Sequence, residues 1–211
     1  GSSALYLARQ MVEHGAADCV LAVGFEQMIP GALGATFHDR KHVMTMHAET
    51  QYAIQGYDDT APPAAQMFGG GGVEYQQRHG TPDEVFGLIS VKARKHAANN
   101  PLALFRDPLT LEEVMASKHL YGPLTRFQAC PPTCGAAAAV LVSPDFAAKH
   151  GLKADVEILA QALTTDYQAT FEGRSMMSVV GYDMSRGAAD QVFEASGVSP
   201  DDIDVVELHD C

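Results

Sequence analysis

A His-Asp-Cys tripeptide, His209 to Cys211, stands at the carboxyl end of the 211-residue chain. It follows the stretch 202–208, in which polar and apolar residues alternate with the period of a half-buried strand. Enzymes with layered sheets carry their reacting groups where strands end. The residues alone leave two interpretations open: a part of an active site, or a terminal histidine without function.

The other cysteines are Cys19, Cys130 and Cys134. Cys19 opens an apolar run and is expected to fill the core. Cys130 and Cys134 are separated by three residues, which is not the spacing of a zinc site, and a redox role is the weaker alternative for them. Cysteines distributed in this way do not form a disulfide framework, and they favour a reducing compartment.

Three histidines, His38, His42 and His47, raise the question of a metal site. His38 and His42 would share one face of a helix, but the glycines around them do not favour a helix. No His-Glu-x-x-His pattern is present. The favoured interpretation is that these side chains are solvated, and we expect no metal.

Composition narrows the classes of partner. The formal net charge of −12 argues against nucleic acid and anionic membranes as broad electrostatic partners. Hydrophobic residues make up 46% of the chain, which is typical of a globular protein. No apolar run approaches the about 20 residues of a membrane-spanning helix.

The first part of the chain predicts an α/β unit. Residues 4–14 carry apolar side chains at helical spacing, and Gly15 is expected to end this helix. Residues 18–25 form a short apolar run that is typical of a buried strand.

The segment 31–121 is rich in histidine and glycine and has little strand pattern, so we interpret it as a largely helical insertion. Mixed proline and glycine in 61–72 predict a turn or hinge, and its four glycines lack the lysine of a phosphate-binding loop. A helix is expected from Thr81, as its N-cap, to His96, and a shorter one begins at Thr110.

The α/β pattern then resumes. A second buried strand is expected at 135–143, a short helix at 146–150 and a third strand at 156–160. A helix follows at 184–196 and the last strand at 202–208.

Several blocks of the sequence occur in the order in which one known family carries them: GSSALYLARQMVEHGAADCVLAVGFEQM, APPAAQMFGGGG, NNPLALFRDPLTLEEVMASK, CPPTCGAAAAVLVS, VEILAQALTTD and DIDVVELHDC. In these blocks the chain resembles the thiolase superfamily, specifically the sterol-carrier-protein type of thiolase and its bacterial lipid-transfer-protein relatives. The resemblance runs from Gly1 to Cys211.

The resemblance implies an α/β thiolase fold with α-β-α-β-α layers, of which this chain is expected to hold the middle. Residues 1–36 and 121–146 would belong to the N-terminal half. Residues 37–120 would be the loop domain inserted in that half, and 147–211 would begin the C-terminal half.

In this family a nucleophilic cysteine would lie shortly before Gly1, and further acid and base residues would follow Cys211. The resemblance implies that His209 donates a hydrogen bond to the thioester oxygen in the catalytic cavity. Asp210 would orient a neighbouring group, and Cys211 would be a small buried residue rather than the nucleophile. The chain by itself is therefore expected to be inactive.

The resemblance also suggests residues that bind substrate. Gln66, Met67 and Phe68 would line the acyl pocket or, equally, pack the loop domain against the core. The loop with Cys130 and Cys134 resembles the part of thiolases that meets the pantetheine of acyl-CoA. Cys134 stands where the family more often has aspartate, so the local hydrogen bonding is expected to depart from the family's.

A basic cluster interrupts the acidic composition at Lys92, Arg94, Lys95 and His96. It would either contact the phosphates of coenzyme A or form a solvated helix face, and the solvated face is the favoured interpretation.

The implied activity is that of a 3-oxoacyl-CoA thiolase in fatty-acid or sterol side-chain metabolism. It would use coenzyme A as co-substrate, have no bound cofactor and act as a homodimer. The alternatives are a thiolase-like aldolase of steroid-CoA side chains and a non-catalytic lipid-CoA-binding protein. The expected compartment is a bacterial cytoplasm, or a peroxisome if the protein is eukaryotic.

Overall fold

The structure, a computed structural model, describes residues 1–31 and 37–209. The described residues form two compact units, the first from 1–31, 132–165 and 185–207, and the second from 37–131, 166–184 and 208–209. The chain is a mixture of helices and strands, as the sequence predicts. The expected α-β-α-β-α layers and the domain boundaries stay a prediction. None of the helices in the described ranges is long and apolar enough to cross a membrane.

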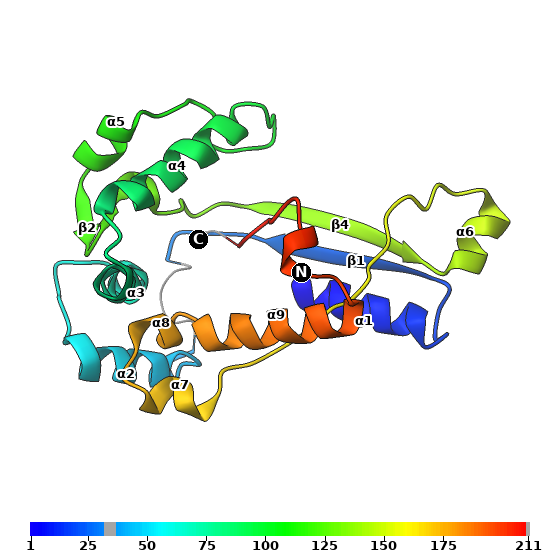
Figure 1. Cartoon of the computed structure of the whole chain (residues 1–211), viewed down its shortest axis with the longest axis horizontal. Helices are drawn as coiled ribbons and strands as arrows, with labels where there is room; N and C mark the ends of the chain where they lie inside the picture. The colour runs from blue at the N-terminus through cyan, green and yellow to red at the C-terminus, as the bar shows by residue number, and fades with distance from the viewer. Residues whose placement is uncertain (32–36, 210–211) are drawn as a thin grey trace. The chain divides into compact units, whose positions relative to one another are not determined.

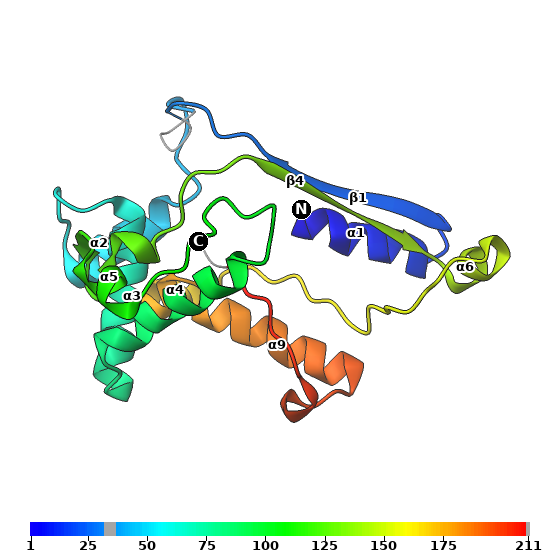
Figure 2. The ribbon, with the colours of Figure 1, turned by 90° about the horizontal axis from the view of Figure 1, so that it is seen from above.

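The first unit is built on an antiparallel pair of strands. Strand β1 (Cys19–Glu26) pairs with β4 (Gly135–Val142), from Cys19 opposite Val142 to Glu26 opposite Gly135. Helix α1 (Ser2–Glu13) packs against both strands, and the three elements lie side by side in Figures 1 and 2. The unit also holds α6 (Pro144–His150), most of α9 (Tyr182–Ser196) and the 3₁₀ helix η2 (Pro200–Asp202).

Both strands form where they are predicted, but most of their side chains are not buried, with Ala22 as the buried exception. Leu21 and Phe25 are exposed, and so are the first six residues of β4. Cys19 is exposed as well, so its expected role as a core filler is wrong. A sheet of two strands with one helix against it covers only part of its surface, and this leaves large apolar side chains in contact with solvent.

The two later strands are absent. Residues 156–160 and 203–208 have no regular secondary structure, and Val156 and Val205 are more than four-fifths exposed. A strand exists only where another strand accepts its hydrogen bonds, and within the described chain β1 and β4 pair only with each other. An alternating pattern is therefore not sufficient for a strand here.

The second unit is mainly helical, which confirms the prediction for the segment up to residue 121. Its long helices are α2 (Thr45–Gln55), α3 (Pro63–His79) and α4 (Asp83–Ala97). Its shorter elements are α5 (Leu111–Ala116), β2 (His119–Tyr121), β3 (Leu124–Thr125), the 3₁₀ helix η1 (Arg126–Gln128), α7 (Gln168–Glu172) and α8 (Met176–Val179).

One detail of these helices differs from the prediction and another agrees with it. Pro82, not Thr81, is the N-cap residue of α4, and no side chain caps that end. Thr110 does cap α5, in a reciprocal pair of hydrogen bonds with Glu113.

The glycine-rich stretch is not a turn or hinge, because it lies inside α3. The helix begins at Pro63, a residue that suits the first helical turn. A Cβ atom at Gly69 would lie 2.6 Å from the carbonyl oxygen of Tyr121, and one at Gly71 would lie 3.0 Å from a methyl group of Val180. The glycines thus let β2 and the end of α8 approach the helix closely, which offsets their low helix propensity.

Candidate functional site

The second unit carries a groove of about 260 Å³ on one face of α4. Phe86, Ile89, Ser90, Ala93 and Arg94 follow one another at helical spacing and line it. The remaining walls come from α3, β3, η1 and the loop after η1, through Phe68, Leu124, Phe127, Gln128, Ala129 and Cys130. Most of these side chains are apolar, so the groove suits an apolar chain.

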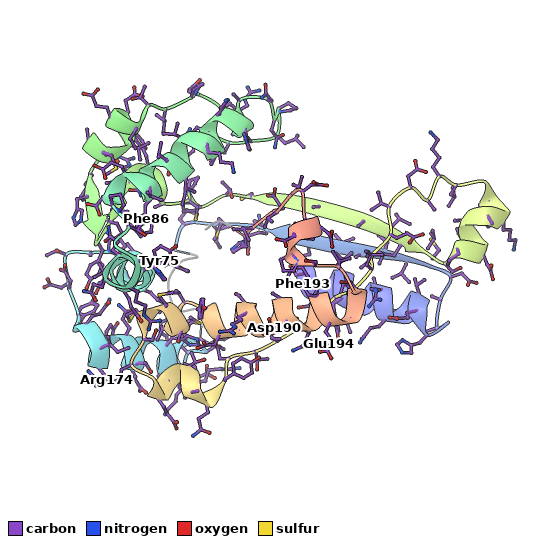
Figure 3. All side chains as sticks on the ribbon, in the orientation of Figure 1. Tyr75, Phe86, Arg174, Asp190, Phe193 and Glu194 are labelled. Atoms are coloured by element: carbon purple, nitrogen blue, oxygen red, sulfur yellow. The ribbon has the colours of Figure 1, made fainter. Side chains whose placement is uncertain are left out.

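The aromatic side of the groove is fixed by contacts with α3. Phe86 meets Tyr75 edge to face, with ring centroids 6.4 Å apart, and the two labelled side chains lie next to each other in Figure 3. Phe68, which directly precedes the four glycines of α3, reaches the groove from the same helix.

Polar groups stand at two places in the groove. The backbone N–H of Thr125 donates to Oε1 of Gln128 at 2.7 Å, which fixes the orientation of that amide. Its Nε2 atom is buried and has no hydrogen-bond partner among the described residues, so it is a donor held in place. The guanidinium of Arg94 stacks over the ring of Phe105, 4.6 Å from its centroid.

The structure brings together two of the predicted substrate-binding residues, Phe68 and Cys130. Met67 is half-buried and does not line the groove. In the basic cluster, Arg94 lines the groove, whereas Lys92 and Lys95 are exposed, as expected of a solvated helix face.

Gln66 is fully buried, and its side chain is used within the protein. Its Nε2 donates to the carbonyl oxygens of Asp58 and Ala61, at 2.6 and 2.8 Å, and its Oε1 accepts from the N–H of Asp58 at 3.0 Å. Of the two roles considered for this residue, the contacts fit packing: the amide fastens the loop 58–61 to α3.

Cys134 belongs to the first unit and joins two of its loops. Its Sγ atom accepts from the N–H of Met28 at 3.2 Å and lies 3.6 Å from the carbonyl oxygen of Met28, to which the thiol donates. A thiol thus makes the local hydrogen bonds at the position where the family resemblance leads one to expect a carboxylate.

His209 is exposed, follows the irregular stretch 203–208 and does not line the groove. Asp210 and Cys211 lie outside the described residues. The catalytic role of His209 therefore stays a prediction.

The three candidate metal ligands do not share an environment. His38 and His42 are exposed, as expected. His47 is not solvated, because its side chain is only 12% exposed and pairs with Asp166. Among the described residues no group of three or more metal-ligating side chains is placed to hold an ion.

Sequence reasoning missed Phe86, Phe127 and Gln128. The available signal was the spacing of apolar residues in α4, but that pattern also contains Val85 and Leu88, which are exposed. The period of a helix predicts that a face is apolar, whereas the position of η1 decides which face becomes the groove.

Comparison with a solved structure identifies the fold to which the chain belongs. A solved structure of the Ltp2-ChsH2(DUF35) aldolase superposes with a TM-score of 0.68, covering 96% of this chain and 51% of that one, at 24% sequence identity. The likeness shows a shared fold. No family model matches the sequence.

Curated relatives match along the whole chain. Sterol carrier protein 2 of Homo sapiens is 48% identical over 213 residues, and the benzoylsuccinyl-CoA thiolase subunit of Thauera aromatica is 30% identical over 213 residues. The chain spans 39% of the first relative's length and 51% of the second's. The resemblance to the sterol-carrier-protein type within the thiolase superfamily is therefore confirmed, as homology over all of this chain.

Proposed function

We propose that the chain is the central part of an acyl-CoA C-acyltransferase that acts on fatty-acyl or sterol side-chain esters of coenzyme A. The groove on α4 carries the proposal, because its apolar walls, fixed amide donor and neighbouring cation are the groups that an acyl-CoA would need. Homology to a thiolase and to sterol carrier protein 2 supports the same class of substrate.

The size of the groove sets what it would hold. Pockets for whole small ligands usually measure about 300–1,000 Å³. The present groove, about 260 Å³, is suited to one part of an acyl-CoA, the acyl chain or the pantetheine arm. The Nε2 group of Gln128 would then donate to a carbonyl oxygen of the ligand, and Arg94 would face its phosphates.

In the proposed reaction a cysteine thiolate attacks the 3-oxo carbon of the substrate. The Cα–Cβ bond breaks, the electron pair passes to the thioester enolate, and protonation releases acetyl-CoA or its homologue. The acyl-enzyme is resolved when the thiol of a second coenzyme A takes the acyl group. His209 would donate a hydrogen bond to the thioester oxygen, on which charge develops.

The nucleophile in this proposal would precede Gly1 in a longer polypeptide. We therefore expect this chain alone to bind acyl-CoA without thiolysis. The same longer polypeptide is proposed to be a homodimer, which light scattering would test against a monomer. The expected compartment, a bacterial cytoplasm or a peroxisome, also stays a prediction.

Binding can be tested on the chain as it stands. Isothermal titration with octanoyl-CoA and with free coenzyme A should give tighter binding for the acyl ester, because the groove buries apolar surface. Phe127→Ala should weaken binding of octanoyl-CoA about tenfold, since an aromatic wall is lost. Val85→Ala is the matched control, because Val85 lies on α4 outside the groove. Equal weakening by both variants would count against the groove.

A test of the proposed carbon–carbon cleavage needs the longer polypeptide. Mass spectrometry after incubation with a 3-oxoacyl-CoA should reveal an acyl group on the cysteine that precedes Gly1. Carbon–carbon cleavage of a steroid-CoA without an acyl-enzyme would favour the aldolase alternative, to which the fold of the similar aldolase structure also corresponds. Binding without any cleavage would favour the non-catalytic alternative.

A further inference from the structure

Helices α2 and α7 meet through polar side chains that are almost inaccessible to solvent. Gln51 on α2 is 2% exposed, and Thr170 on α7 is 1% exposed. Both helices belong to the second unit and contact each other, with α8 beside them (Figure 1). Buried polar groups normally have hydrogen-bond partners, so this contact needs a physical explanation.

His47 lies in the same contact, one helical turn before Gln51. Its Nε2 atom is 3.2 Å from Oδ2 of Asp166, and its ring meets the ring of Phe171 edge to face at 5.0 Å. A carboxylate accepts hydrogen bonds, so Nε2 of His47 is the donor in this pair and carries a ring proton. In the tautomer with its single ring proton on Nε2, Nδ1 of His47 is an acceptor.

Three polar atoms in this contact are buried and have no hydrogen-bond partner among the described residues: Nδ1 of His47, Nε2 of Gln51 and Oγ1 of Thr170. His47 and Gln51 lie four residues apart and so share one face of α2. Thr170 directly precedes Phe171, which touches the ring of His47. These adjacencies place the three residues on the two helices that contact each other, α2 and α7.

We propose that this region is a binding site for one internal water molecule, bridging His47, Gln51 and Thr170. The ligand has to accept a hydrogen bond from the Gln51 amide and donate one to Nδ1 of His47. A metal cation or an ammonium ion cannot accept, and a simple anion cannot donate, whereas water does both. The Thr170 hydroxyl supplies a third bond, which is the usual number for a buried water.

A bridging water can satisfy either orientation of the Gln51 amide. If its oxygen faced the site, water would donate to that oxygen as well as to His47, and Thr170 would donate to the water. In both cases the water turns three unpaired polar groups into one connected network.

The bound water would have a definite structural task. Together with the His47–Asp166 pair it fastens residues 166–172 to α2, and Nη2 of Arg174 adds a bond to the carbonyl oxygen of Ala53 at 3.1 Å. Arg174 is labelled in Figure 3, at the end of this segment. The segment leads into α8, which packs against α3. Hydration of the site therefore helps to hold α8 in position.

A crystal structure of the unmodified chain tests the proposal directly. We expect one spherical density peak within about 2.7–3.2 Å of all three polar atoms. Direct hydrogen bonds among the three side chains, or a cavity without density, would overturn the assignment. Nitrogen NMR of His47 should show the tautomer protonated at Nε2, and protonation at Nδ1 would also contradict it.

Thermal stability gives a second test, because the direction of the change in Tm distinguishes a site that holds water from a dry one. With the water present, Thr170→Val and Gln51→Leu each lower Tm, because the water loses a partner, and the double variant loses less than the sum. With a dry site, each substitution removes an unpaired polar group, so Tm rises. A rise in either single variant overturns the proposal.

Two threonines provide matched controls for this test. The buried Thr125 hydroxyl donates to the carbonyl oxygen of Val114 at 2.8 Å, so Thr125→Val should lower Tm in either case. Thr133 is exposed, and Thr133→Val should leave Tm unchanged.

Discussion

Glu74 cross-links two segments of the second unit that are about a hundred residues apart in sequence. From α3 its carboxylate accepts hydrogen bonds from the Ser175 hydroxyl at 2.8 Å and from the backbone N–H of Met177 at 3.0 Å. It also forms an ion pair with Arg78 on the same helix. Burial, the largest single influence, raises the pKa of Glu74, but these partners outweigh it, and the pKa lies below its ordinary range.

The change we propose is Glu74→Gln, which keeps the shape and removes the charge. Hydrogen bonds to a charged group contribute about 1.5–3 kcal/mol each, and an exposed ion pair within one helix about 0.3–0.5 kcal/mol. The amide retains one acceptor, so we expect a loss of about 2–3 kcal/mol in the free energy of unfolding at pH 7. The Glu74 side chain is 18% exposed, so solvent screens these bonds only partly.

The pH dependence follows from the direction of the shift. Because the pKa of folded Glu74 is depressed, its contribution is fully present above the unfolded value of about 4.3 and is lost as pH falls through the folded pKa. The difference in stability between the native chain and Glu74→Gln should therefore shrink as the pH falls below the pKa that this carboxyl has in the unfolded chain.

Urea titrations followed by circular dichroism would measure this difference, with amide hydrogen exchange at Met177 as the local probe. Glu157→Gln is the matched control, since Glu157 is exposed in an irregular segment and its loss should change stability by less than about 0.5 kcal/mol. If Glu74→Gln behaves like this control, or if its effect is independent of pH, the reasoning is refuted.

Two further substitutions test the packing of α3. Gly69→Ala would place a Cβ atom 2.6 Å from the carbonyl oxygen of Tyr121. Although alanine favours helices, we expect urea titrations to show a loss of about 1–3 kcal/mol in the free energy of unfolding. A gain in this free energy would contradict the close approach. Gln66→Leu would leave the loop 58–61 without its hydrogen bonds at a fully buried site, and a fall of about 3 kcal/mol is expected. The exposed Pro62 and Ala64 beside this site should become more protease-sensitive, and unchanged cleavage would speak against the role of Gln66.

Local signals predicted the helices with strong boundaries. Helix α1 ends before Gly15 and α9 before Gly197, both of which have positive φ angles, the conformation that glycine adopts most easily. The same local logic failed at α3, because its four glycines indicate a break when read alone. The glycines are explained by the tertiary structure, because the backbone of Tyr121 and the side chain of Val180 occupy the space where Cβ atoms would be.

The candidate site was predictable only in part. The family resemblance singled out Phe68 and Cys130, and both line the groove. Phe127 and Gln128 enter it because η1 packs against α4, and no periodicity in the sequence encodes that contact. The pair of His47 and Asp166 joins residues 119 positions apart, which is beyond the reach of spacing rules.

The sequence by itself determined the family, the helical character of the segment before residue 121, and the carboxyl ends of α1 and α9, because these depend on residue order and on neighbours within a turn or two. Tertiary structure decided that 156–160 and 203–208 are not strands here, since a strand depends on a partner elsewhere in the chain. It also decided that the Gln66 amide is used for packing and that His47 pairs with Asp166. Burial and hydrogen-bond satisfaction are properties of surroundings that only the folded chain assembles.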